Sequence, residues 1–214
     1  MFEKVWVTDH AKGTKLEGIQ SINTSVALNP ICQKRAKNPD SVCAKCYAEK
    51  LLRARKSLDQ HLTENTEILT HPMSDCQIAT VPVTSYYVRI ESFGDVANVE
   101  QCRNYIKIAQ AHSYQHFTPW TKNKGLWIQA FKELGKPQNM TLVISSPKLN
   151  ERVYISKEDR EWVDHRFTVW TKAEYERRGF AGGCTACAGI SCISQCGCKC
   201  YKKDTSFDID EQLR

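Results

Sequence analysis

The placement of cysteines is the feature that most constrains this chain. It has 11 cysteines in 214 residues. Cys32, Cys43 and Cys46 fall in one early segment, and the last two form a C-x2-C pair. Six more are gathered near the end of the chain: Cys184, Cys187, Cys192, Cys196, Cys198 and Cys200. Thiols spaced this closely indicate either a disulfide framework or a metal site.

The compartment favours the metal site. The chain begins MFEKVWVTDHAKG and lacks the apolar stretch of a secretory signal, and no run approaches the roughly 18 apolar residues of a membrane span. We therefore expect a soluble protein of the cytoplasm with no membrane partner. A reducing compartment disfavours structural disulfides, and an odd number of cysteines cannot all pair.

The cysteine spacing fits two kinds of metal. Cys43 and Cys46 can reach one metal from a tight turn, and Cys32 can complete a three-thiolate set. A [4Fe–4S] cluster held by three cysteines leaves one iron open, whereas four cysteines close it. The tail could donate one ligand to this cluster or hold a second cluster. The alternative is a structural zinc site built from Cys43, Cys46, Cys184 and Cys187.

Strand patterns separated by helix patterns indicate the fold. Strands are expected within residues 19–28, 86–91, 116–121, 141–146 and 166–170. Such a chain forms parallel strands joined by right-handed crossovers. The length supports an α/β fold, either a partial (β/α) barrel or an open parallel sheet of about five to six strands. We expect a domain over residues 1–180 and a cysteine-rich segment over 181–214 packed on it.

Local signals predict further details. The spacing of apolar residues predicts one amphipathic helix from Tyr47 to Leu62, and residues 71–85 read as a loop. Asp95 is a plausible N-cap, and Pro119 suggests an edge strand or a bulge. Capping-box pairs, Ser156 with Asp159 and Thr171 with Glu174, predict two helix starts. Cys102 falls on a helix stripe and is expected in the core, and Cys76 stands apart.

Polar residues follow several predicted strands. The stretch VRIESFGD (88–95) places Glu91, Ser92, Gly94 and Asp95 after one strand. The pattern F-T-x-W-T-K occurs twice and places Lys122 and Lys172 after two others. Parallel strands gather such residues at one edge of the sheet, where α/β proteins bind ligands. The catalytic candidates are therefore Glu91, Asp95, Lys122 and Lys172. A plain helix cap at Asp95 and surface exposure of the lysines are the alternatives.

Basic residues give the chain a net charge of +6, and they concentrate in KRAK (34–37) and EKLLRARK (49–56). The basic helix could bind nucleic acid, or it could be a solvated face beside an anionic cluster or ligand. No recognised nucleic-acid motif accompanies the charge. The sequence also lacks the G-x-S-x-G, G-x4-G-K-[ST], H-E-x2-H and G-x-G-x2-G patterns.

Several segments together resemble a known family. They are SINTS (21–25), CAKCYA (43–48), RIESFGD (89–95), the W-T-K strand ends and the cysteine-rich tail. Over about residues 17 to 201 the chain resembles the bacteriophage gene-product-88 type proteins, whose cysteine loop is similar to that of radical S-adenosylmethionine enzymes. Ten residues separate Cys32 from Cys43, so the loop is longer than the C-x3-C-x2-C loop common in those enzymes.

The resemblance implies a cofactor arrangement. Cys32, Cys43 and Cys46 would ligate a [4Fe–4S] cluster, with S-adenosylmethionine on the open iron. Glu91, Ser92 and Gly94 would lie where the second strand of those enzymes meets the amino acid end of the cofactor. The tail cysteines would supply further ligands to one cluster, or to two.

The leading hypothesis is a phage-encoded iron–sulfur protein of the host cell cytoplasm. As an enzyme it would act on a small-molecule substrate, either by radical S-adenosylmethionine chemistry or by Lewis-acid hydrolysis at the open iron. The alternative is a non-enzymatic module, held together by zinc or by a cluster, that binds host protein or nucleic acid. The sequence leaves the substrate and the oligomeric state open.

Overall fold

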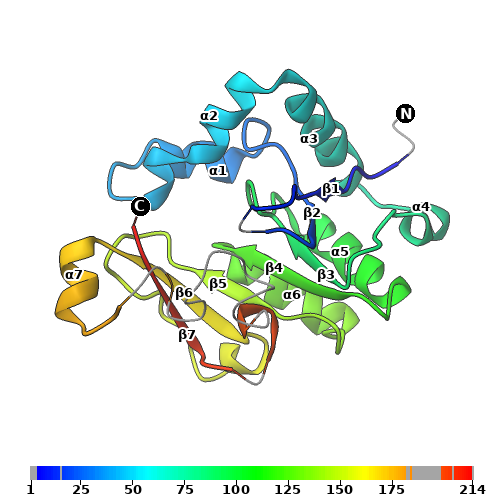
Figure 1. Ribbon diagram of the computed structural model, residues 1–214. Helices are drawn as coiled ribbons and strands as arrows, with labels where there is room; N and C mark the ends of the chain where they lie inside the picture. The colour runs from blue at the N-terminus through cyan, green and yellow to red at the C-terminus, as the bar shows by residue number, and fades with distance from the viewer. Residues whose placement is uncertain (1–3, 15, 182–183, 185–198, 204, 214) are drawn as a thin grey trace.

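Seven strands form one open sheet in a computed structural model that describes residues 4–14, 16–181, 184, 199–203 and 205–213 (Figure 1). Their order in the sheet follows their order in the chain. The strands are β1 (Thr8–Asp9), β2 (Ile19–Ile22), β3 (Tyr87–Ile90), β4 (His116–Thr121), β5 (Val143–Ser145), β6 (His165–Trp170) and β7 (Asp208–Gln212). β1 is antiparallel to β2, and all other neighbours are parallel.

This sheet confirms the predicted α/β class with an open, mostly parallel sheet. The expected number of five to six strands is too low, because the sequences of two short strands show no strand pattern. β1 has only two residues, too few to show a period. β7 follows the cysteine-rich tail, and its sequence DIDEQ is mostly polar. Arg166 pairs with Asp208, which holds this polar strand against β6.

Seven α-helices lie in the described part of the chain. They are α1 (Pro30–Ala36), α2 (Tyr47–Ala54), α3 (Lys56–Leu69), α4 (Asp75–Ala79), α5 (Val99–Ala111), α6 (Lys124–Leu134) and α7 (Lys172–Arg177). Three 3₁₀ turns accompany them: η1 (Val42–Lys45), η2 (Asp159–Glu161) and η3 (Lys199–Tyr201). None of the described helices is long and apolar enough to cross a bilayer.

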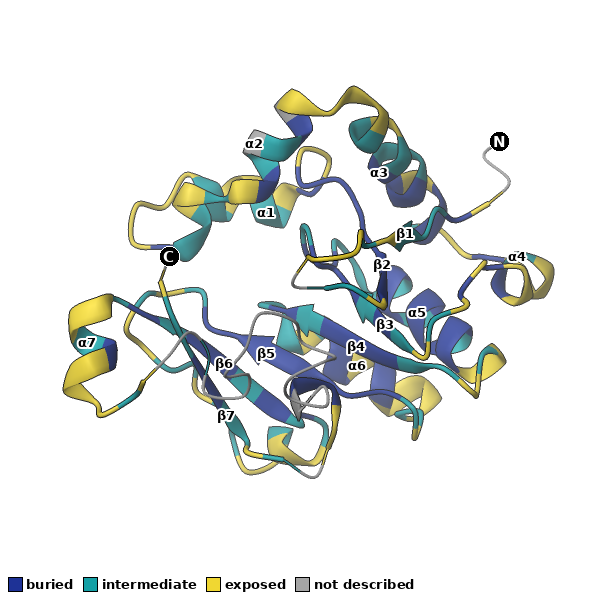
Figure 2. Cartoon of the chain, in the orientation of Figure 1, coloured by how far each residue is buried: buried dark blue, intermediate teal, exposed yellow. Residues whose placement is uncertain are grey.

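The two faces of the sheet are covered differently. Helices α3 to α6 pack on one face, where their apolar residues join Ile22, Ile90 and Phe117 in the largest core cluster. Right-handed crossovers between strands in sequential order all fall on the same face, which explains this arrangement. On the other face Phe167 and Ile209 pack against Cys200 and Tyr201 of η3. The buried colour of the central strands in Figure 2 reflects this double cover.

The predicted helix from Tyr47 to Leu62 is two helices. Arg55 has φ −132° and ψ 84°, so the chain bends between α2 and α3. The bend lets the two helices serve different parts of the molecule. α3 docks on α5, where the Asn104 side chain donates to the carbonyl of Leu69 at 2.9 Å. α2 instead rises over the sheet edge together with α1 (Figure 1).

Three other local predictions are corrected. Residues 71–85 contain the short helix α4, capped by Ser74 and Gln77 in a capping box. Asp95 is not the N-cap of α5, because Asn98 caps it by accepting from the backbone N–H of Gln101 at 2.9 Å. The pair Ser156 and Asp159 opens only the 3₁₀ turn η2. The predicted start of α7 at Thr171 is confirmed.

Pro119 lies in a central strand rather than at an edge. β4 has β3 on one side and β5 on the other. On the β5 side, Phe117 pairs with Met140 in an isolated bridge, and regular pairing resumes only at Trp120 with Val143. The missing N–H of Pro119 therefore falls opposite a gap in the ladder, where no hydrogen bond is lost.

Candidate functional site

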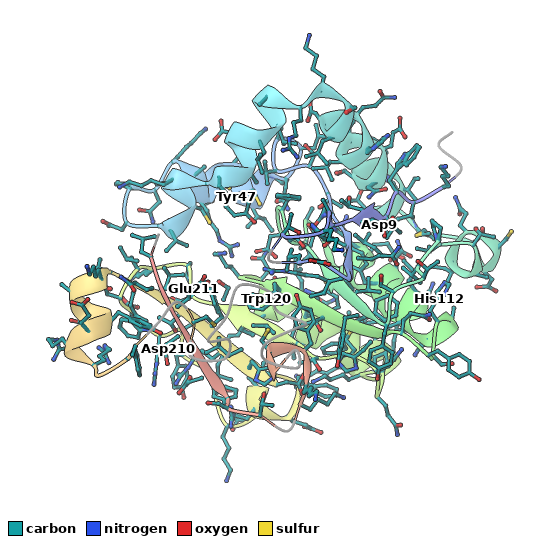
Figure 3. The ribbon with its side chains drawn as sticks, in the orientation of Figure 1. Asp9, Tyr47, His112, Trp120, Asp210 and Glu211 are labelled. Carbon is teal, nitrogen blue, oxygen red and sulfur yellow. The ribbon has the colours of Figure 1, made fainter. Side chains whose placement is uncertain are left out.

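A cavity of about 670 Å³ lies at the carboxyl ends of the parallel strands. Residues that follow β3, β4 and β7 line it from the sheet, and α1, η1 and α2 line it from the opposite side. In Figure 1 these covering helices arch over the sheet edge. Figure 3 shows Tyr47, Trp120 and Glu211 around this region, from α2, β4 and β7. The predicted gathering of strand ends thus forms a partly open site of a size typical for small-molecule ligands.

Five described cysteines line this cavity. They are Cys32 in α1, Cys43 in η1, Cys46 between η1 and α2, and Cys184 and Cys200 from the tail. The predicted ligands Cys187, Cys192, Cys196 and Cys198 lie outside the described residues. The seven described cysteines are free. Cys76 is exposed, and Cys102 is buried in the core as predicted.

Local capping places two of the first three thiols. The Asn29 side chain accepts from the backbone N–H of Ile31 and of Cys32, so Cys32 lies in the first turn of α1. The same side chain donates to the carbonyl of Asp95. The Ser41 hydroxyl accepts from the Cys43 N–H at 3.1 Å and so caps η1. These bonds fix the backbone that carries Cys32 and Cys43.

Electrostatics distinguish Cys32 from an ordinary surface thiol. Burial raises the pKa of the Cys32 thiol, and the nearby Asp95, Glu91 and Cys43 raise it further, whereas Arg35 opposes them. The thiol is therefore protonated at neutral pH unless a cation joins it. Metal binding at such a thiol releases a proton.

The donors fit a thiolate-bound metal in type. Thiolates are the soft ligands that iron–sulfur clusters and zinc prefer. Within the described residues, however, no group of three or more His, Cys, Asp or Glu side chains is drawn together closely enough to hold a metal ion. The cysteines share one cavity without forming a gathered ligand set in that part of the chain.

Glu91 lies at the edge of this cavity with its carboxyl group buried. It follows β3 with a φ of 59°. Its Oε1 accepts from Thr24 Oγ1, Gln101 Nε2 and Tyr105 OH, each at 2.8 Å. Burial raises the pKa of Glu91 to about 8, although these hydrogen bonds oppose the shift. Burial thus favours the protonated form of Glu91, and its hydrogen bonds tie the end of β3 to the loop after β2 and to α5.

Ser92 and Gly94 line the same edge. The Ser92 hydroxyl forms a hydrogen bond of 2.8 Å with the Ser21 hydroxyl, which also lies 2.7 Å from His10 Nε2. Gly94 has φ +80°, and a Cβ there would lie 3.1 Å from both Glu91 Oε2 and the carbonyl oxygen of Thr24. Both positions are thus part of a tightly bonded turn, and their predicted contact with a cofactor stays a prediction.

Asp95 joins the cover to the sheet. Its Oδ2 accepts from Arg35 Nη1 and from the Lys122 backbone N–H, both at 2.9 Å. Its Oδ1 accepts from the Thr121 hydroxyl and from the Val96 N–H. Asp95 therefore fixes α1 against the end of β4 instead of capping a helix.

The two lysines of the repeated pattern have different surroundings. Lys122 follows β4 and lines the cavity. Lys172 is the first residue of α7, its side chain is 74% exposed, and it lies 4.0 Å from Glu176. The structure therefore brings Lys122 to the other candidates and leaves Lys172 away from them. Lys172 is thus exposed on the surface, which was the alternative to a role in the site.

The basic segments are only partly available to a partner. Arg35, in the middle of KRAK, donates to Asp95, to the Lys122 carbonyl and to Asn123 Oδ1. This arginine holds α1 in place instead of facing solvent. Binding of nucleic acid through the basic helix stays a prediction.

Sequence reasoning missed the pair Arg89 and Trp120. The Arg89 guanidinium lies 4.2 Å from the centroid of the Trp120 ring, and both residues line the cavity. Arg89 is two residues before Glu91 and faces the side of β3 opposite the helices. The sequence did contain a signal for this pair. Arg89 is a charged residue within a buried strand, and such residues are uncommon unless they are paired or functional.

An open parallel α/β sheet with a cysteine-lined cavity at its carboxyl edge defines the class of this protein. The chain belongs to the Gene product 88 family, whose model matches residues 7–208. This match confirms the resemblance seen in the motifs. It does not extend to the likeness with radical S-adenosylmethionine enzymes. Searches of curated proteins and of solved structures gave no match.

Proposed function

We propose that this protein binds an iron–sulfur cluster in the cavity at the carboxyl edge of its sheet and uses it to act on a small molecule. The observation that carries the proposal is the convergence of Cys32, Cys43, Cys46, Cys184 and Cys200, from both ends of the chain, on one cavity of about 670 Å³. Structural metal sites are closed and compact, whereas this cavity leaves room for a further ligand.

Each part of the wall has a role in this proposal. Cys32, Cys43 and Cys46 would hold a [4Fe–4S] cluster, and a cysteine of the tail is available as a further ligand. Such a cluster supplies electron transfer, or a Lewis-acidic iron when one position stays open. The chain itself encloses the reaction space under α1 and α2. Asp95 and Arg35 keep this cover in place.

Metal loading tests the proposal directly. The full chain is reconstituted with iron and sulfide without oxygen, and iron, sulfide and zinc are measured per chain. About four irons with absorbance near 400 nm are expected for one cluster, and about eight for two. Cys43→Ser should lose the cluster, whereas Cys76→Ser, which changes an exposed cysteine outside the cavity, should keep it. A colourless protein that carries only zinc would contradict the proposal.

A second measurement tests the reaction class. The reconstituted protein is reduced and mixed with S-adenosylmethionine, and 5′-deoxyadenosine is quantified. Its formation supports radical chemistry. If the cluster is intact and S-adenosylmethionine is not cleaved, the radical reaction is excluded. Lewis-acid chemistry at the open iron is then the remaining reaction class.

A further inference from the structure

The floor of the cavity carries a line of three side chains that the metal proposal does not use. Arg89, Trp120 and Lys122 come from β3, from β4 and from the residue that follows β4, and all three line the cavity. The Arg89 guanidinium stacks on the Trp120 ring at 4.2 Å. We call these three residues the cationic floor. A guanidinium held flat on an indole has a fixed orientation and keeps its charge.

Lys122 supplies a charge that the described residues do not neutralise. Its backbone N–H donates to Asp95, but no described carboxylate lies within ion-pair distance of its ammonium group. Asp95 is already matched by Arg35 at 2.9 Å. Burial raises the pKa of Glu91, which reduces the negative charge that it adds near pH 7. Lys122 therefore lines the cavity as a cation that no described carboxylate pairs with.

Flat apolar surfaces stand beside the cationic floor. Phe167 contacts the edge of Trp120 with ring centroids 4.9 Å apart. Phe93 and Tyr47 form a second aromatic pair at 5.8 Å on the wall of the cavity. The Tyr47 hydroxyl is held by the carbonyl of Ser92 at 2.6 Å. Rings with fixed orientations favour a planar ligand, and the cations favour an anionic one.

We propose that this cavity binds a small molecule that carries an oxyanion, a carboxylate or a phosphate, on a planar apolar body, with Lys122 as the anion-binding residue. The inference deepens the proposed function and rests on it, because it names the class of molecule that the cluster would act on. Anion binding itself needs only the chain, so it can be measured in the metal-free protein.

The test uses two defined probes and a matched pair of variants. Phenyl phosphate and benzoate are titrated by calorimetry into the metal-free chain, and neutral benzamide serves as the uncharged probe. Lys122→Met removes the charge and keeps the chain length. Lys132→Met makes the same change at an exposed lysine of α6 outside the cavity. Lys122→Arg restores the charge at the original position. The fold of each variant is checked by circular dichroism.

At least one anionic probe is expected to bind tighter than benzamide, and Lys122→Met should weaken this binding about tenfold, the worth of one charged hydrogen bond. Lys132→Met should leave it unchanged, and Lys122→Arg should recover most of it. Binding of phenyl phosphate alone assigns a phosphate ligand, and binding of benzoate alone assigns a carboxylate. Equal binding of benzamide, or equal effects of Lys122→Met and Lys132→Met, would overturn the inference.

The two proposals fail separately. Iron and sulfide are measured on the Lys122→Met protein as well. A chain that loads iron on its cysteines but shows no preference for anions keeps the metal proposal and refutes the cationic floor. A chain that binds the anion but takes up no iron keeps the anion site and refutes the metal proposal.

Discussion

Glu91 is a buried acid whose proton links stability to pH. Its pKa is about 8 in the folded protein and 4.5 as the ordinary value. Between these values the folded chain holds one more proton than the unfolded chain, so raising the pH from 4.5 to 8 lowers the free energy of unfolding. The loss is on the order of a few kcal/mol.

Glu91→Gln is therefore expected to flatten the pH dependence of stability. Glutamine is neutral at every pH and can still accept from Thr24 and Tyr105, as Glu91 does. Urea unfolding of the metal-free protein at pH 5 and at pH 8 measures the effect. Glu67→Gln, at an exposed position of α3, is the control and should keep the wild-type slope. A variant that loses as much stability as wild type between the two pH values would contradict a raised pKa at Glu91.

Gly94 combines a left-handed backbone with a close approach of two oxygens. An alanine Cβ would lie 3.1 Å from Glu91 Oε2 and from the Thr24 carbonyl. We expect Gly94→Ala to cost about 2 to 3 kcal/mol, the sum of backbone strain and crowding. Gly13 has nearly the same φ, +82°, with nothing within 4 Å of an added Cβ. Gly13→Ala should thus cost only the strain, about 1 kcal/mol. Thermal unfolding compares the two, and equal losses would show that crowding at Gly94 has no effect.

At the scale of elements, one ion pair connects the cover to the sheet. Arg35 of α1 reaches Asp95, whose side chain is 4% exposed, and also the chain that follows β4. Removal of one partner leaves a buried charge without its counter-charge, which costs about 3 kcal/mol. The loss should be local, because the bonds of Arg35 join α1 to the segments that follow β3 and β4.

Arg35→Met is expected to speed amide exchange across residues 30–46 while the strands of the sheet stay protected. Arg103→Met removes an arginine that pairs with Glu100 and Glu133 on the surface, and it should cost less than about 1 kcal/mol. Hydrogen exchange with mass spectrometry separates the two variants. Uniform loss of protection in Arg35→Met would show that the pair supports the whole fold rather than the cover alone.

The elements that sequence patterns predicted well are those whose signals are local. Thr171 caps α7 through its own side chain, and α6 ends at Gly135, whose φ is +78°. The bend at Arg55 was not predictable in this way. Its apolar spacing continues across the bend, whereas α3 turns away to contact α5, which lies far along the chain.

The repeated F-T-x-W-T-K pattern shows why the site was only partly predictable. Phe117 packs on the helix-covered face of the sheet, whereas Phe167 packs on the opposite face. The two copies are thus inverted with respect to the sheet. Both strands are buried on both sides, so their sequences lack the alternation that would have revealed the orientation. Because the two copies are inverted, Lys122 lines the cavity whereas Lys172 lies on the surface.

At the scale of the molecule, the cavity results from strand order and from the return of the chain. Sequential strands put their helices on one face, which leaves the carboxyl edge to be enclosed by other segments. The long connection from β2 to β3 supplies α1 and α2. The C-terminal segment supplies β7 and Cys200. Residues near both ends of the chain therefore meet around one space, and a metal held there would link them.

This arrangement predicts that cluster loading protects both ends at once. If the cluster takes ligands from the loop of Cys43 and from the tail, amide exchange should slow in residues 30–54 and also in β7. A ligand at 100 times its dissociation constant adds about 2.7 kcal/mol of stability, which is about 100-fold slower exchange where opening is coupled to unbinding.

Hydrogen exchange of the reconstituted and metal-free proteins measures this coupling. Cys200→Ser should reduce the added protection in β7 more than in residues 30–54, and Cys76→Ser should change neither segment. Cys200 is the suitable position because it is 4% exposed and packs with Ile209 of β7. Added protection confined to residues 30–54 would show that the first loop holds its cluster without the tail. The six tail cysteines would then belong to a separate site.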